Sequence, residues 1–349
     1  MQITYTINKL DTFVRISADD NENIKEYLLY IYKFDKHIRT EAAQNSPIFS
    51  VNIDSTGIFR FHAFAKYKNG LVIDKISEPF FINSSFKSHE PLDVKCLERG
   101  SFFSREIDNT NFWCYFKKSP YKRLFILLAG NIKRDNPVSL FRFDRWSWDE
   151  KFPGSILCIS DPSIHMAKNG LTLGWYIGTH ELNITDLMSR LAIEVANQLE
   201  IKPKKIICYG SSGGGFASIA LAHKLGATAV AINPQTNIMK YEDKPVKRFL
   251  EFYSPSGYVD ENRFSLIERL KNKNKTNIVY VQNKFDYSHV NDHLMPIMET
   301  LNFSSIESST SIDGCNELLC FEDDNGHGGE PADLVNKIIQ LSIKYSDKK

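Results

Sequence analysis

A serine in a glycine-rich turn is the residue whose setting points most directly to chemistry. The segment Gly210-Ser211-Ser212-Gly213-Gly214-Gly215 follows an apolar run at 205–209 and precedes an apolar helical segment. It contains Gly-x-Ser-x-Gly centred on Ser212, in the strand–turn–helix setting of a nucleophile elbow. Ser211 does not fit the pattern, because Tyr209 stands at its preceding glycine position. The glycines are expected for steric reasons, since a Cβ there would hold strand and helix apart.

Two later segments supply the base and the acid that a serine nucleophile needs. His327 lies in a loop of small residues after the last apolar run, 317–321, and Asp286 follows the preceding run, 277–281. Where an elbow carries the nucleophile, the chain order is serine, acid, histidine. The sequence therefore predicts a triad of Ser212, Asp286 and His327. A phosphate-binding loop at 210–215 is not favoured, because the Gly-Lys-Ser/Thr ending is missing.

For each partner of the serine, the sequence offers alternative residues. Asp292 could replace Asp286, and two further carboxylates, Asp323 and Asp324, stand close to His327. Solvated or hydrogen-bonding roles are expected for the other histidines nearby, which are His289 and His293 beside the acid and His223 on the helix after the elbow.

Candidate residues for the oxyanion and the substrate follow from the same arrangement. The backbone N–H of Gly213 would be one donor, and that of Asn131, in the loop after the apolar run at 124–129, would be the second. Two aromatic stretches carry weaker signals. Arg145, Trp146 and Trp175 could stack on a sugar ring or bind its hydroxyls, or could simply pack one edge of the sheet.

The elements that must position these residues have two different periods. Up to about residue 85, short segments of period two, rich in aromatic and β-branched residues, predict a small all-β sandwich of immunoglobulin-like type. After a polar connection at 86–118, continuous apolar runs alternate with helical patterns over 119–349. This alternation predicts a mostly parallel sheet covered on both faces, and together with the elbow it predicts an α/β-hydrolase fold. An insertion at about 235–275 would form a lid over the site.

The composition excludes several classes of protein. Lys plus Arg total 43 and Asp plus Glu total 42, so the net charge is +1, without the basic surplus of a nucleic-acid binder. No run approaches the ~20 apolar residues of a membrane span, and the first residues lack the apolar core of a signal peptide. We therefore expect a cytoplasmic protein. No metal site or disulfide framework is expected from the six isolated cysteines at 96, 114, 158, 208, 315 and 320.

Several motifs also resemble a known group of proteins. The region 119–349 is similar to α/β-hydrolase-fold proteins of bacterial capsule and surface-polysaccharide biosynthesis, including carbohydrate O-acetyltransferases and accessory-secretion proteins that modify glycans. The resemblance rests on the elbow and on four further motifs: Phe143-x-Arg145-x-Ser147-Trp148, Ile159-Ser160-Asp161-Pro162, Gly174-Trp175-Tyr176-Ile177-Gly178 and Ile232-Asn233-Pro234-Gln235.

The resemblance implies acyl chemistry on a glycan in the bacterial cytoplasm. The expected reaction is transfer of an acyl group through a serine ester, with acetyl-CoA as a possible donor and no bound cofactor. An esterase with the same triad is the alternative, because the motif does not separate transfer from hydrolysis. A peptidase or lipase is also compatible with the triad, although the charged segment Lys240-Tyr241-Glu242-Asp243-Lys244 is unlike the apolar lid of a lipase. A non-catalytic scaffold of polysaccharide assembly, with the N-terminal module as its docking part, is the remaining alternative.

Overall fold

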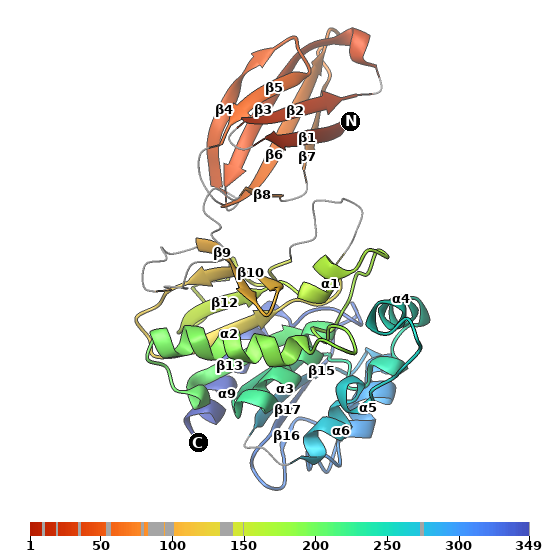
Figure 1. The fold of residues 1–349 in the computed structure, drawn as a ribbon. Coiled ribbons are helices and arrows are strands. Elements are labelled where there is room, and N and C mark those ends of the chain that lie inside the picture. The colour runs from red at the N-terminus through yellow and green to blue at the C-terminus, as the bar shows by residue number, and fades with distance from the viewer. Residues whose placement is uncertain are drawn as a thin grey trace. The chain divides into compact units, whose positions relative to one another are not determined.

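The structure, a computed structural model, describes residues 1–8, 11–18, 20–33, 36–53, 57–77, 80–82, 94, 101–132, 142–148, 150–272 and 276–348. Cys96 and most of the connection at 83–100 lie outside these ranges. Contacts divide the described residues into two units, one up to residue 82 and one from residue 94 (Figure 1). Each unit is described by itself.

The N-terminal unit consists of two antiparallel sheets. The first has the order β1 (Gln2–Asn8), β2 (Asp11–Ser17), β5 (Ile48–Asn52). The second has the order β4 (Lys36–Gln44), β3 (Ile24–Lys33), β6 (Gly57–Tyr67), β7 (Val72–Ile76), and β8 (Phe80–Ile82) also pairs with β6.

Alternate residues of these strands fill one apolar core between the two sheets. Val14 and Phe49 come from the first sheet, and Leu29 and Phe61 come from the second. The period-two pattern thus correctly indicates an all-β unit, since successive side chains of a strand point to opposite faces. The immunoglobulin-like topology stays a prediction.

The second unit is built on one mixed sheet of nine strands. Their order is β16 (Ser309–Thr310), β17 (Glu317–Phe321), β15 (Asn277–Asn283), β14 (Thr228–Ile232), β13 (Ile206–Ser211), β11 (Leu124–Leu128), β12 (Ser155–Ile159), β10 (Thr110–Lys117), β9 (Ser101–Ile107). The six strands from β17 to β12 pair in parallel, and β16, β10 and β9 pair antiparallel.

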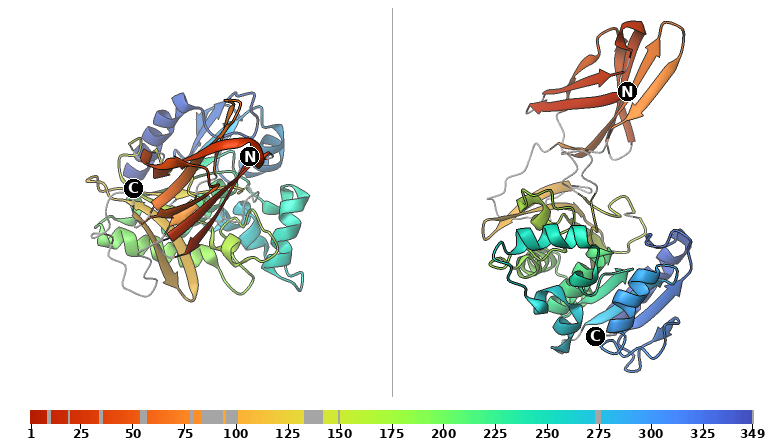
Figure 2. Two further views of the ribbon diagram at one scale, coloured as in Figure 1. Left: turned by 90° about the horizontal axis from the view of Figure 1, so that it is seen from above. Right: turned by 90° about the vertical axis from the view of Figure 1, so that its right-hand side faces the viewer.

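The central strands are continuous apolar runs because helices cover both faces of the sheet. Every residue of β11 and β14 is buried. Helices α2 (Ile184–Gln198) and α3 (Gly213–Leu225) lie on one face and α9 (Ala332–Asp347) lies on the other (Figures 1 and 2). None of the described helices combines the length and apolar character that a membrane crossing requires.

The polar connection at 86–118, for which we predict no strand or helix from the sequence, contains two strands. β9 and β10 form a hairpin along one edge of the sheet, turning at Asp108 and Asn109, which both have positive φ. In β10, Phe112, Cys114 and Phe116 are buried. Asp-Asn is a suitable pair for such a turn, so this pair beside alternating aromatic residues is the signal that could have indicated the hairpin.

Short helices connect the strands around the carboxyl edge of the sheet. The segment after β14 contains η3 (Ile238–Lys240), α4 (Asp243–Tyr253), α5 (Glu261–Phe264) and α6 (Leu266–Lys271). At the same edge lie α1 (Pro162–Met166) after β12, and α7 (Tyr287–His289), the π-helical turn η4 (Val290–Leu294) and α8 (Met295–Ile297) after β15. Elsewhere, η2 (Pro203–Lys205) precedes β13, and η1 (Asn21–Asn23) belongs to the N-terminal unit.

Candidate active site

Ser212 occupies a strained turn between β13 and α3. Its backbone has φ 56° and ψ −123°, a combination outside the usual regions for a residue with a side chain. The turn is held by a hydrogen bond from Ser212 N to Ile232 O at 2.9 Å. A Cβ on Gly210 would overlap the carbonyl of Gly214, and a Cβ on Gly214 would overlap the carbonyl of Leu128. The expected steric role of the glycines is therefore visible at both positions.

The register of the parallel strands brings the other site residues to the same edge. Ser211, at the end of β13, is opposite Ile232 of β14, which is opposite Val281 of β15. Asn283, two residues further along β15, pairs with Phe321 of β17. The carboxyl ends of these neighbouring strands therefore lie in line, and the loops that follow them meet above the sheet.

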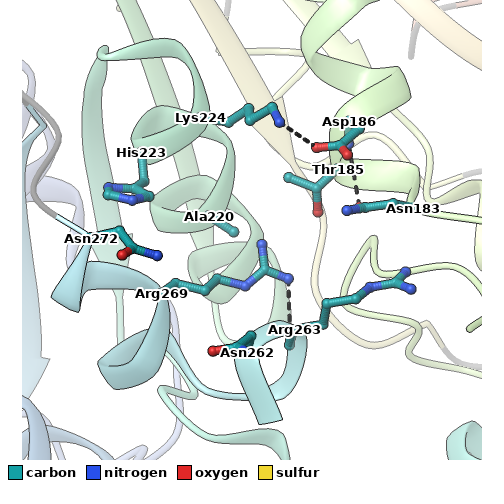
Figure 3. Close-up of a pocket in the computed structure, with 10 residues that line it drawn as sticks. All are labelled: Asn183, Thr185, Asp186, Ala220, His223, Lys224, Asn262, Arg263, Arg269 and Asn272. Atoms are coloured by element: carbon teal, nitrogen blue, oxygen red, sulfur yellow. Dashed lines mark hydrogen bonds and ion pairs between the residues drawn. The ribbon is translucent and has the colours of Figure 1, made fainter. Parts of the chain in front are cut away.

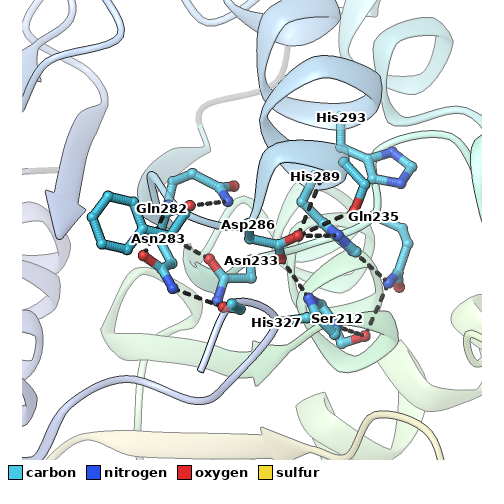
Figure 4. A network of polar contacts seen from close by, with 12 residues as sticks. Ser212, Asn233, Gln235, Gln282, Asn283, Asp286, His289, His293 and His327 are labelled. Carbon is cyan, nitrogen blue, oxygen red and sulfur yellow. Dashed lines mark hydrogen bonds and ion pairs between the residues drawn. The ribbon is translucent and has the colours of Figure 1, made fainter. Parts of the chain in front are cut away.

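Ser212, His327 and Asp286 form a continuous hydrogen-bonded chain (Figure 4). The Ser212 Oγ lies 2.9 Å from His327 Nε2, and His327 Nδ1 lies 2.7 Å from Asp286 Oδ2. Asp286 is 4% exposed, whereas the side chain of His327 is 35% exposed. The carboxylate is thus screened from water, and part of the imidazole is open to it.

The electrostatics keep Asp286 ionised. Burial opposes the charge, but the imidazole N–H groups of His289 and His327 both favour it, and together they lower the pKa of Asp286 below its usual value. Asp286 also accepts from the backbone N–H of His289, at 3.4 Å, as the N-cap of α7. A carboxylate held in this state can orient an imidazole and stabilise its protonated form.

A second histidine shares the same carboxylate. His289 Nδ1 lies 3.1 Å from Asp286 Oδ1, and its ring stacks on that of His327 with centroids 4.0 Å apart. Because an ionised carboxylate only accepts, both Nδ1 atoms carry a proton and both Nε2 atoms accept. Burial lowers the pKa of His289, so this second imidazole is neutral near pH 7.

Gln235 connects the second histidine to Ser212. Its Nε2 donates to Ser212 Oγ at 2.9 Å and to His289 Nε2 at 3.0 Å. The indole N–H of the fully buried Trp175 donates to Gln235 Oε1 at 3.2 Å and so fixes which end of the amide faces the serine. With a donor already at its oxygen, the Ser212 hydroxyl proton is directed to His327 Nε2.

Two buried asparagines hold the loop that carries His327. Asn233 Nδ2 donates to Gly328 O at 2.9 Å, and its Oδ1 accepts from Asn283 N at 2.7 Å. Asn283 Nδ2 donates to the carbonyls of Asp323 and Gly326, both at 2.7 Å. Sequence reasoning singled out Asn233 only as part of a motif and missed Asn283, although two asparagines at the ends of neighbouring strands were a usable signal.

The two backbone amides predicted as oxyanion donors lie close to the serine or to the loop beside it. A Cβ on Gly130 would lie 3.4 Å from Ser212 Cβ and 3.9 Å from Gly213 N, so this loop passes beside the elbow. The neighbouring amides of the loop are paired, Ala129 with Tyr176, Gly130 with Asp144 and Ile132 with Thr172. Within the described ranges, the N–H groups of Gly213 and Asn131 have no acceptor. Their role as donors stays a prediction.

Two of the three weak substrate candidates are buried. The Arg145 side chain, 8% exposed, forms a two-fold ion pair with Glu330 at 2.8 and 2.6 Å, and Tyr209 OH donates to the same carboxylate at 2.7 Å. Trp175 is buried against Gln235. In this conformation Arg145 and Trp175 therefore have no face open to a sugar. Trp146 is partly exposed and packs edge-on against Tyr115.

Apart from His289, the alternative acids and histidines lie outside the hydrogen-bonded chain of Ser212, His327 and Asp286. Asp292 is exposed, and Asp323 Oδ1 accepts from Asn325 N. His293 is buried and its Nδ1 accepts from Thr236 N at 3.3 Å. His223 is half-buried on the far part of α3. Of these predicted residues, the structure brings only His289 into contact with Asp286.

Two further features belong to the site. Ligand atoms of Asp286, His289 and His327 all lie within 4.8 Å of one another, an arrangement that would also admit a divalent ion.

Tyr241, from the predicted lid segment, contacts His289 edge-on with centroids 6.1 Å apart. Burial, followed by the nearby carboxylates of Glu242 and Asp286, raises the pKa of Tyr241 to about 12. The segment after β14 therefore reaches His289.

Comparison with known proteins bears on the fold. No protein-family model and no curated protein sequence matches the chain. Among solved structures, it is similar to the capsule O-acetyltransferase of Neisseria meningitidis serogroup A (16% identity, 70% of this chain and 92% of that one, TM-score 0.46). It is also similar to a Glycosylation Associate Protein (Gap123) complex from Streptococcus agalactiae (13%, 100% and 70%, TM-score 0.47).

A third solved structure supports the assignment of the fold. A putative dipeptidyl aminopeptidase IV from Bacteroides ovatus shares 12% identity with the chain, over 99% of this chain and 57% of that one, with a TM-score of 0.50. At this identity the likeness concerns the fold alone. The chain therefore has a hydrolase-type fold, with its large mixed sheet preceded by an all-β unit.

Proposed function

We propose that the protein is a serine acyltransferase of the α/β-hydrolase fold that acts through Ser212, His327 and Asp286. The observation that carries the proposal is the unbroken chain from Ser212 Oγ through His327 to Asp286, at 2.9 and 2.7 Å. The strained backbone of Ser212 adds support, because strain of this kind persists where a nucleophile must be presented.

The reaction proceeds as a double displacement. His327 Nε2 takes the hydroxyl proton as Ser212 Oγ forms a bond to the acyl carbonyl carbon. The N–H groups of Gly213 and Asn131 stabilise the tetrahedral oxyanion, each by about 3 kcal/mol. Collapse of the oxyanion breaks the bond to the leaving group, which receives the proton from His327. An acceptor hydroxyl then gives its proton to His327 and attacks the carbonyl of the serine ester. As the ester bond to Ser212 breaks, His327 returns this proton to Ser212 Oγ, which regenerates the free serine.

We propose a sugar hydroxyl of a bacterial surface glycan as the acceptor, with acetyl-CoA as donor, in the cytoplasm. This part rests on the sequence resemblance at Ser212, Ile232-Asn233-Pro234-Gln235 and the aromatic motifs. The N-terminal all-β unit would then bind proteins of polysaccharide assembly, and the segment 235–275 would act as a lid. Water in place of the sugar hydroxyl turns the same cycle into an esterase, which is the second candidate. A scaffold does not need the hydrogen-bonded serine.

Labelling with a fluorophosphonate probe tests the serine. Wild-type protein and Ser211→Ala are expected to be labelled and to turn over p-nitrophenyl acetate, and Ser212→Ala is expected to do neither. Ser211 is a matched control because it precedes the nucleophile on the same turn. Equal labelling of Ser212→Ala and wild type would contradict the mechanism, and so would a folded wild type that neither labels nor turns over.

The acceptor is tested separately from the serine. Labelled acetyl-CoA is incubated with the protein and oligosaccharides of surface polymers, and acetyl sugar and free acetate are measured. Acetyl sugar that forms with wild type and not with Ser212→Ala supports the transferase, whereas acetate alone at every sugar concentration supports the esterase.

A further inference from the structure

A pocket lies away from the proposed catalytic residues, between α2, α3 and the short helices α5 and α6 (Figure 3). Its volume is about 350 Å³, within the size range of small-ligand sites. The residues that line it are mostly polar or cationic: Asn183, Thr185, Asp186, Ala220, His223, Lys224, Asn262, Arg263, Arg269 and Asn272. The lining residues that belong to α3 lie in its second half, whereas Ser212 directly precedes the first residue of this helix.

Most of the charge around this pocket is already neutralised or occupied. Lys224 Nζ pairs with Asp186 Oδ1 at 2.9 Å, and both side chains are about half exposed. Arg263 Nη1 donates to Thr179 O at 2.8 Å and its Nη2 donates to Leu182 O at 3.0 Å, so this guanidinium fastens the loop before α2. These two cations therefore have partners within the protein.

Arg269 is different, because it forms no ion pair with any acidic side chain of the described residues. Its one hydrogen bond among the described residues runs from Nη2 to Arg263 O at 2.9 Å. Its Nε is buried without a partner in the same part of the chain, and its guanidinium packs over the Phe216 ring at 5.8 Å. Figure 3 shows the guanidinium directed into the space between α2 and α3.

The surroundings of Arg269 balance its positive charge only in part. Burial, followed by the neighbouring charge of Arg263, lowers the pKa of Arg269 to about 10, so it remains charged at neutral pH. Asp260 and Asp186 raise this pKa through space, but neither forms a direct contact with the guanidinium in the described part of the chain. A partly buried cation without a direct counter-charge is unfavourable. The favourable solution is an anion within reach of the guanidinium, which offers donors in a planar fork.

We propose that this pocket binds the phosphoryl group of a small ligand, with Arg269 as its principal contact. The side-chain amides of Asn262 and Asn272 line the same space and can donate to the remaining oxygens. A dianionic group matches a pocket whose lining holds three cationic residues, Lys224, Arg263 and Arg269, and one carboxylate, Asp186. The site is separate from the acyl chemistry, and it neither requires nor uses Ser212.

Calorimetric titration with inorganic phosphate tests the site, with sodium chloride of equal ionic strength as the blank. Saturable binding is expected for wild type and for Ser212→Ala, and binding at least tenfold weaker for Arg269→Gln. Lys271→Gln is the matched control, because it removes the same charge from the same helix outside the pocket and should change the affinity less than twofold.

A second variant keeps the test informative if Arg269→Gln does not fold. Asn262→Asp places a carboxylate in the exposed wall of the pocket and should also weaken phosphate binding at least tenfold. No saturable binding by wild type, or unchanged affinity in a folded Arg269→Gln protein, would overturn the proposal.

Adenosine 3′,5′-bisphosphate and coenzyme A form the second arm of the titration. Tighter binding than inorganic phosphate identifies the phosphoryl group as part of a larger molecule. Equal or weaker binding identifies free phosphate as the ligand. In either case the effect of Arg269→Gln must persist.

Discussion

Replacing Asp286 by asparagine should do more than remove a charge, because two imidazoles share its carboxylate. Oδ2 accepts from His327 Nδ1 at 2.7 Å, and Oδ1 accepts from His289 Nδ1 at 3.1 Å. A carboxamide has only one acceptor oxygen. In Asp286→Asn, one of the two histidines must therefore move its proton from Nδ1 to Nε2.

The surroundings decide which histidine changes. Oδ1 also accepts from Ser288 Oγ at 3.2 Å and from His289 N at 3.4 Å, so the amide oxygen is expected to stay on that side. The amide NH2 then faces His327 and forces the proton onto its Nε2, which can no longer accept from Ser212. The same change of tautomer in a serine protease lowers kcat by about 10⁴. We expect a decrease of about 10⁴ in kcat/KM for Asp286→Asn.

Removing the second histidine should restore part of the activity lost in Asp286→Asn. His289→Leu keeps a side chain of similar bulk but removes the Nδ1 donor, one of the three donors at Oδ1. The amide oxygen is then held less firmly on that side and turns to His327 in a larger fraction of molecules. The gain is about one hydrogen bond, or ~1.4 kcal/mol, which is roughly tenfold.

The assay is a double-mutant cycle in kcat/KM for an activated acyl ester. Thermal unfolding of all four proteins serves as the control for folding. His289→Leu should lower the activity of wild type and raise that of Asp286→Asn. If it lowers both by the same factor, the two histidines do not compete for one acceptor and the reasoning fails.

Three further predictions concern stability. Glu330→Gln leaves the buried Arg145 without a counter-charge and should reduce the free energy of unfolding by about 3–5 kcal/mol in urea; Asp108→Asn, which breaks the exposed pair with Arg190, should reduce it by less than about 1 kcal/mol, and equal losses would contradict the buried role. Ser212→Gly should be about 1–3 kcal/mol more stable than Ser212→Ala, because glycine relieves the positive φ and alanine does not; the same urea midpoint for both would show an unstrained turn. Burial, followed by the neighbouring charge of His289, lowers the pKa of His293 to about 3, so the unfolded chain takes up a proton below about pH 6.5 that the folded protein refuses. Stability present above this pH is therefore lost as the pH falls from 6.5 towards 3, and the melting temperature of His293→Asn should depend less on pH over this interval than that of wild type.

The sequence contains enough information to place Ser212 on the turn between strand and helix, because the glycine pattern is a local feature. Glycines on a strand–helix turn report a backbone shape, and the ends of two later apolar runs indicate where Asp286 and His327 lie. Register does the rest, since parallel strands end at one edge of the sheet. The five predicted runs at 124–129, 205–209, 227–232, 277–281 and 317–321 correspond to strands of the sheet within two residues at either end.

The side-chain network around the triad could not be predicted in the same way. Gln235, His289 and Trp175 meet only through the fold, and their roles depend on which amide atom faces which ring. Arg145 illustrates the same limit. An arginine between aromatic residues resembles a sugar contact, but its partner Glu330 stands 185 positions later in the chain. Pairings at that separation carry no local signal.

The hydrogen bonds of Asn283 have a consequence for local opening of the loops at the site. The backbone N–H groups of Phe285 and Asp323 both donate to Asn283 Oδ1, with N···O distances of 3.1 and 3.0 Å, although neither residue belongs to a strand or a helix. Because Asn283 is a buried part of the central sheet, releasing these protons to solvent requires opening of the sheet edge itself. In hydrogen–deuterium exchange these two amides, one in the loop after β15 and one in the loop after β17, should therefore exchange with the slow core amides and not with their exposed neighbours.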